Sequence, residues 1–139
     1  MRYFYEPKET YMTSGVAENV DCYLLVKCIE LLNCLKEKGV NPDYLQVYRF
    51  SYNKETNVLT IRHTQEQPDY VNEVSFEVPS DVLAYDGKIY YMDELTHYIF
   101  LEADEYYKGG GKMFGYYLAG IGAGLALISV MKKRTITVR

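Results

Sequence analysis

Residues 21–38 read DCYLLVKCIELLNCLKEK, and they are the most informative part of the chain. Their apolar residues recur at helical spacing and leave lysine, glutamate and asparagine on the opposite side, which is typical of a helix packed on a sheet or another helix. Gly39 and Pro42 follow, as is usual where a helix ends. We therefore predict an amphipathic helix from Asp21 to Lys38, with its stripe in the core rather than on a partner. The stripe consists of Leu24, Leu25, Cys28, Ile29, Leu31, Leu32 and Leu35.

After Pro42 the apolar period changes from that of a helix to that of a strand. Alternation predicts strands near residues 44–52, 58–64, 72–78, 88–92 and 95–101. Strands that follow a single helix favour an antiparallel sheet with the helix laid across one face. The expected fold class is therefore α+β: one amphipathic helix packed on an antiparallel sheet of about four to five strands, plus a C-terminal hydrophobic helix.

Composition divides the chain into four parts. Residues 1–107 form the expected acidic α+β domain, 108–112 a glycine-rich joint, 113–131 a candidate transmembrane helix and 132–139 a basic tail. The 19 residues of 113–131 carry no charge, and as a helix they would rise about 28 Å, close to the roughly 30 Å hydrocarbon core of a bilayer. Four glycines in this segment weaken its hydropathy. The alternative is therefore a segment buried in protein as a hairpin or helix in an oligomer.

The net charge of −4 hides an asymmetry. Residues 108–139 hold six basic and no acidic residues, whereas residues 1–107 hold nine basic and 19 acidic residues. The body is a poor candidate for nucleic-acid binding, because phosphate contacts need clustered lysine and arginine. An acidic body with a basic, apolar tail indicates instead a membrane or an oppositely charged partner.

The residue types that usually carry chemistry form no recognised constellation. Cys22, Cys28 and Cys34 lie on three different sides of the predicted helix, which excludes a shared metal site or a disulfide within it. His63 and His97 have no metal-ligand spacing around them. We therefore expect no catalytic residue, no metal and no cofactor.

Glycines and acidic residues near the C-terminal end match no phosphate-binding or calcium-binding motif. The run 120–124 (GIGAG) departs from the dinucleotide-binding fingerprint because its third glycine comes one residue early. Gly120 and Gly124 form instead a GxxxG pattern, a candidate helix-association face. Glu102, Asp104 and Glu105 lack the spacing of a calcium loop, and a solvated strand end is the simpler interpretation.

Four blocks of sequence are similar, in this order, to a known family. They are Tyr11-Met12-Thr13-x-Gly15-Val16, Asp43-Tyr44-Leu45-Gln46-Val47, His63-x-Gln65-Glu66-x-Pro68-x-Tyr70 and Glu102-Ala103-Asp104-Glu105-Tyr106. Over about residues 10–107 the chain resembles the uncharacterised family catalogued as domain of unknown function 960, found in low-GC Gram-positive bacteria, their phages and mobile elements. The resemblance leaves out the C-terminal tail. It implies a bacterial or phage setting, and it implies no activity.

His63, Gln65, Glu66 and Tyr70 are the candidate binding surface, because they gather at a strand end and turn, and loops carry function more often than cores do. The expected function is a non-enzymatic protein-interaction module, held at the bacterial cytoplasmic membrane by residues 113–131, with its body in the cytoplasm. The alternative is a soluble, cytoplasmic phage or mobile-element factor that binds a host defence protein, with its tail buried in an oligomer.

Overall fold

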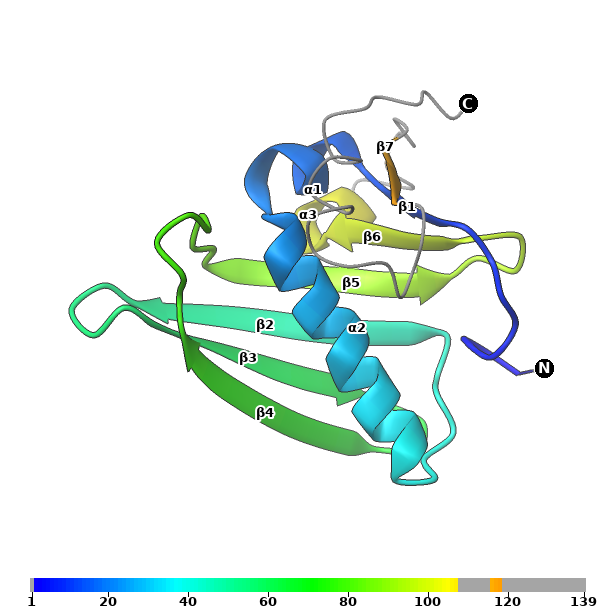
Figure 1. Cartoon of the computed structure of the whole chain (residues 1–139). Helices are drawn as coiled ribbons and strands as arrows, with labels where there is room; N and C mark the ends of the chain where they lie inside the picture. The colour runs from blue at the N-terminus through cyan, green and yellow to red at the C-terminus, as the bar shows by residue number, and fades with distance from the viewer. Residues whose placement is uncertain (1, 108–115, 119–139) are drawn as a thin grey trace.

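The computed structural model describes residues 2–107 and 116–118. In these residues seven strands form one sheet in the order β4-β3-β2-β5-β6-β1-β7, and three helices accompany it (Figure 1). The elements along the chain are β1 (Thr10–Met12), α1 (Ser14–Asn19), α2 (Cys22–Glu37), β2 (Leu45–Asn53), β3 (Val58–Gln65), β4 (Tyr70–Glu77), β5 (Gly87–Asp93), β6 (Tyr98–Glu102), α3 (Ala103–Tyr107) and β7 (Tyr116–Leu118).

Helix α2 is the predicted amphipathic helix, and its ends have specific causes. The Asp21 carboxylate caps the start by accepting the Tyr23 N–H at 3.0 Å. At the other end Gly39 adopts a φ of 80°, and the Val40 N–H bonds back to the Leu35 carbonyl at 3.3 Å. A glycine in this left-handed conformation is the usual way to end a helix. The helix lies across one face of the sheet (Figure 1).

The sheet is larger than expected and mixed rather than antiparallel. Strands β2 to β6 occupy the predicted places and pair antiparallel with their neighbours. The expectation of four to five strands missed β1 and β7, which pair with each other antiparallel, while β1 runs parallel to β6. Each has three residues, which is too short for alternation to mark a strand.

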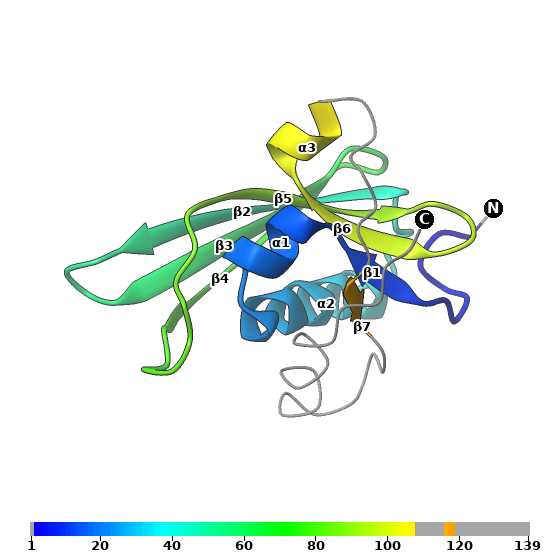
Figure 2. The same ribbon diagram turned by 90° about the horizontal axis from the view of Figure 1, so that it is seen from above.

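Both faces of the sheet are covered over part of their area. On the α2 face the main core contains the fully buried rings of Tyr48, Tyr91, Phe50 and Phe100. On the other face Tyr90, Ile99 and Leu101 form a second cluster, against which Tyr106 of α3 packs. Figure 2 shows α3 on the side of the sheet opposite α2. The fold is thus an α+β sandwich whose second cover is a single short helix.

The expected C-terminal hydrophobic helix, 113–131, lies mostly outside the described residues, as do Gly120 and Gly124. Three residues of that segment, Tyr116–Leu118, are described, and they are extended rather than helical. They form β7 because β1 offers an open sheet edge with which their backbone pairs. In residues 2–107 and 116–118 no helix is long and apolar enough to cross a bilayer.

Candidate functional site

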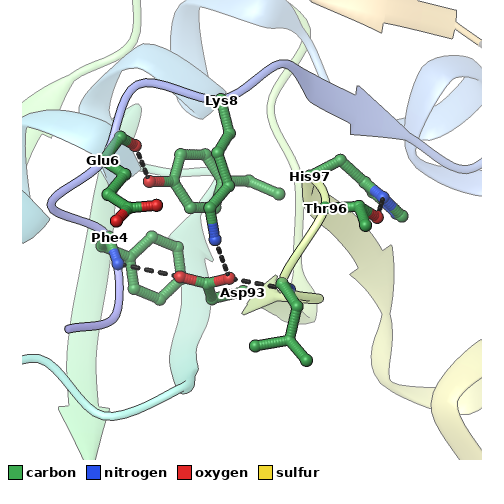
Figure 3. Close-up of polar contacts among 8 residues, drawn as sticks. Phe4, Glu6, Lys8, Asp93, Thr96 and His97 are labelled. Carbon is green, nitrogen blue, oxygen red and sulfur yellow. Dashed lines mark hydrogen bonds and ion pairs between the residues drawn. The ribbon is translucent and has the colours of Figure 1, made fainter. Parts of the chain in front are cut away.

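Residues 3–9, which we call the strap, precede β1 and cross the ends of β5 and β6. The Phe4 N–H donates to one oxygen of the Asp93 carboxylate at 2.9 Å, and the Lys8 ammonium donates to the other at 2.7 Å. The Tyr98 hydroxyl donates to the Glu6 carbonyl (Figure 3). The strap is therefore fixed to the β5–β6 hairpin along its length.

Asp93 is the central anchor of the strap. Its side chain is 1% exposed, and its third hydrogen bond comes from the Leu95 N–H at 2.9 Å. Burial alone would raise the pKa of Asp93, but the bonds from Lys8, Phe4 and Leu95 and the charge of Lys8 outweigh it, so the pKa lies below its usual value. The carboxylate thus stays ionised and keeps both strap contacts.

Phe4 inserts its ring beneath the strap. The ring stacks on Tyr98 at 4.9 Å between centroids and lies 5.0 Å from Tyr91, and Phe4 is 4% exposed. Its φ of 63° is in the left-handed region, which costs a residue other than glycine roughly 1 kcal/mol. Burial of a phenylalanine ring contributes about 2–3 kcal/mol, which is more than this cost.

A cavity of about 750 Å³ lies between the strap and α2. Ile29, Leu32, Asn33 and Lys36 line it from α2, at spacings that put all four on one side of the helix. Tyr91 and Tyr98 line it from the sheet, and Lys8 and Glu9 from the strap. Charged and polar residues make up half of the lining, and a concave site with converging polar groups is a candidate ligand-binding cavity.

Lys36 is a cation of the cavity wall that forms no ion pair with a described residue. Its ammonium donates to the Phe4 carbonyl and lies 5.4 Å from the centre of the Tyr5 ring. No carboxylate of the described residues lies within 4.0 Å of it. Burial lowers the pKa of Lys36. Lys8 differs, because Asp93 neutralises it.

The edge of β1 that pairs with β7 lies beside this cavity. The Glu9 carbonyl accepts the Tyr98 N–H at 2.9 Å, and the Thr13 N–H donates to the Phe100 carbonyl at 3.0 Å. Backbone groups alternate along a strand, so those of Thr10 and Met12 point away from β6, to the edge where β7 pairs. Lys8 precedes β1 and lines the cavity. If the alternation continues through Glu9, whose carbonyl faces β6, the backbone groups of Lys8 face the same edge as those of Thr10.

The predicted binding surface of His63, Gln65, Glu66 and Tyr70 has to be corrected, because two of these residues, His63 and Gln65, are buried. His63 is 0% exposed and Gln65 is 3% exposed. Both lie on the side of β3 that faces α2, the same side as Leu59 and Ile61. Glu66 is exposed and Tyr70 partly so. The tyrosine ring packs edge-on against His63 at 5.6 Å.

His63 and Gln65 belong to an internal hydrogen-bonded network. The Gln65 amide oxygen accepts the Asp43 N–H at 2.9 Å and the Gln46 side-chain amide at 2.8 Å. The Gln46 oxygen therefore turns to His63 Nε2, at 2.6 Å. The Gln65 amide donates to the carbonyls of Asn41 and Pro68. These groups fix the connection before β2 and the turn after β3, which is a structural role.

The acidic cluster near the end of the body joins α1 to α3. The Thr13 hydroxyl donates to the Glu105 carboxylate at 2.6 Å, and the same oxygen accepts the Glu102 N–H at 2.8 Å. A Cβ on Gly15 would lie 2.5 Å from a Glu102 side-chain oxygen, so a larger residue there would displace this carboxylate from its present position. Asp104 is exposed. Two of the three acids therefore hold structure rather than extend into solvent.

The remaining candidates for chemistry lie apart from the cavity wall. The thiols of Cys22 and Cys28 are buried, that of Cys34 is partly exposed, and no disulfide joins any two of them. Burial raises the pKa of Cys28. His97 bonds the neighbouring Thr96 hydroxyl at 2.8 Å. Across residues 2–107 and 116–118, no group of three or more His, Cys, Asp or Glu side chains is placed to hold a metal.

Sequence reasoning missed the strap, Asp93 and Lys36. Asp93 carried a usable signal, since it continues the inward alternation of Ile89 and Tyr91, and an inward carboxylate needs a cation. Lys36 carried no such signal, because a lysine in the last turn of a helix is ordinarily explained by its favourable interaction with the helix dipole.

No family model matches the chain, and no curated protein matches it. In a search of solved structures the chain is similar to a protein of unknown function from Enterococcus faecalis. The two are 22% identical, with a TM-score of 0.56, and the match covers 76% of this chain and 95% of that chain. At this identity the likeness shows the fold alone.

Proposed function

We propose that this chain is a non-enzymatic protein-interaction module that binds an extended segment of a partner by strand addition at β1. The observation that carries the proposal is the pairing of β7 with β1. It means that the β1 edge accepts a strand whose sequence position is far from its own. In strand addition the main-chain hydrogen bonds supply affinity, and pockets for alternate side chains supply specificity.

The cavity supports this proposal through its position along the edge. Leu118 lies opposite Thr10, and β7 runs antiparallel to β1. The next two residues of any strand in this register therefore pass Glu9 and Lys8, both of which line the cavity. The described part of β7 has three residues, and a partner strand that continued past Glu9 and Lys8 would add main-chain hydrogen bonds along this edge. The acidic body would also steer a basic partner protein toward it.

Membrane anchoring through residues 113–131 is the second function that we propose, because these 19 residues carry no charge. The two roles compete for the same residues. When Tyr116–Leu118 pair with β1, residues 119–131 remain, and their 13 residues would rise only about 20 Å as a helix, against a bilayer core of roughly 30 Å. A tail paired with β1 is therefore too short to span.

The test uses the full chain with Leu118→Pro and a fluorescent peptide of residues 114–122. In the observed register the N–H of residue 118 points at β1, so proline removes a ladder bond and frees the edge. We expect fluorescence anisotropy to show peptide binding to this variant, at least about tenfold tighter than to the unchanged chain, in which β7 competes at high effective concentration.

Tyr117→Pro is the matched control, because the N–H of residue 117 points away from β1 and an edge strand tolerates proline there. This variant should bind the peptide as weakly as the unchanged chain. Circular dichroism and a melting curve check that both variants are folded. A folded Leu118→Pro variant that binds no peptide would rule out strand addition at β1.

A further inference from the structure

The side chains of a strand bound at β1 have defined directions. Thr10 is 0% exposed, and its hydroxyl lies 2.9 Å from that of Tyr91, on the α2 side of the sheet. Lys8 points to the same side, since its ammonium bonds Asp93 and lies 5.2 Å from the centre of the Tyr98 ring. The Glu9 carboxylate points away and accepts the Tyr11 hydroxyl.

Residues directly opposite each other in an antiparallel pair project to the same side of the sheet. A partner residue opposite Lys8 therefore projects toward α2, into the cavity. A partner residue opposite Glu9 projects to the other side of the sheet, next to the exposed Glu9 carboxylate. The register thus assigns one position of the bound strand to the cavity: the second residue after the one opposite Thr10.

The cavity wall at this position offers a cation without a counter-charge. Lys36 has no carboxylate of the described residues within 4.0 Å, and it is half-buried. Asn33, which also lines the cavity, adds an amide donor on the same side of α2. The chain's own tail brings no side-chain carboxylate, because residues 108–139 contain no Asp or Glu. Glu6, which also lines the cavity, is exposed, so water screens its repulsion of a bound carboxylate.

We infer that the strand-binding site selects a partner segment with Asp or Glu at the second residue after the one opposite Thr10, and that Lys36 binds this carboxylate. The inference rests on the proposed strand addition at β1 and adds its specificity. An ammonium–carboxylate hydrogen bond is roughly twice as strong as a neutral one. It would also give Lys36 the counter-charge that the described residues do not supply.

The experiment compares two peptides on the full chain carrying Leu118→Pro. Both have the sequence of residues 114–122, with Gly120→Asp in one and Gly120→Asn in the other. The observed register pairs Thr10 with Leu118, and a bound peptide that continued this register by two residues would bring its residue 120 opposite Lys8. The two side chains have the same shape and differ in charge. We expect the Asp peptide to bind about five- to tenfold tighter than the Asn peptide by fluorescence anisotropy.

Lys36→Met keeps most of the aliphatic stem and removes the charge, and it should reduce the Asp/Asn affinity ratio to about one. Lys38→Met is the matched control, since Lys38 is exposed and bonds the Tyr70 hydroxyl outside the cavity. It should leave the ratio unchanged. Equal binding of the two peptides, or a ratio that survives Lys36→Met, overturns the inference and leaves strand addition standing. Failure of every peptide to bind overturns both.

Discussion

At the scale of single residues, His63 is a base held in its neutral form by its surroundings. The network through Gln65 and Gln46 turns an acceptor toward Nε2, so we assign the ring proton to that nitrogen. Nδ1 is then a buried acceptor without a hydrogen bond. Burial lowers the pKa of His63 to about 4, and the Leu31 carbonyl opposes this only in part. Protonation therefore opposes folding.

The stability of the body should consequently fall as the pH is lowered. Unfolded histidine has a pKa near 6.5, and in the folded chain the pKa is about 4, so the unfolded state binds the extra proton between these values. The contribution of His63 is complete above about pH 6.5, and about 3 kcal/mol of it is lost by pH 4. Urea unfolding as a function of pH measures it. In His63→Gln the slope over this window should flatten, and an unchanged slope would contradict the assignment.

The position of His63 could have been predicted from sequence, whereas the network could not. Leu59 and Ile61 already mark the inward side of the strand, and the same parity carries His63 and Gln65 inward. Their hydrogen-bond partners, Gln46 and Asp43, lie 17 and 22 residues away along the chain, so no local sequence pattern predicts these bonds. A polar pair at a strand end was therefore wrongly read as a surface.

At the scale of elements, length separates what could be predicted from what could not. Helix α2 and strands β2 to β6 each repeat their period often enough to be recognised. The six residues of α1, the five of α3 and the three of β1 do not, and their structure depends on contacts. Thr13 and Gly15 meet Glu105 and Glu102 only because β1 and β6 are paired.

The faces of α2 give a direct test of this element. Leu25 is 0% exposed in the main core, and Leu25→Ala should lower the free energy of unfolding by about 2–4 kcal/mol through lost burial and a cavity. Glu30 is the control, since its side chain is 61% exposed and forms a 3.6 Å ion pair with Lys27. Glu30→Ala should cost less than about 0.5 kcal/mol. Equal shifts in denaturant unfolding would show that the assigned faces are wrong.

At the scale of the whole molecule, residues 2–107 form the described core of the sheet, whereas the described residues of the tail pair only with its edge. The two described apolar clusters, on opposite faces, draw their members from residues 3–106. The tail contributes β7, which meets the sheet through β1. The division near residue 107 stays a prediction from composition, because charge and glycine content change there. Composition could not predict β7, since an uncharged segment is compatible with a bilayer, a protein core or an open sheet edge.

The competition between these environments can be measured by liposome flotation of the full chain. Leu118→Pro removes the pairing with β1 and should raise the membrane-bound fraction, because all of residues 113–131 then become free to insert. Tyr117→Pro introduces the same residue into the apolar segment while sparing the ladder, so the difference between the two isolates the strand. Adding Leu125→Arg to Leu118→Pro should abolish binding, at a cost of roughly 3 kcal/mol to insertion.

If Leu118→Pro and Tyr117→Pro float equally, the strand does not restrain the tail. If neither floats and both stay soluble, the segment belongs to protein rather than lipid, and β1 is then its principal described contact.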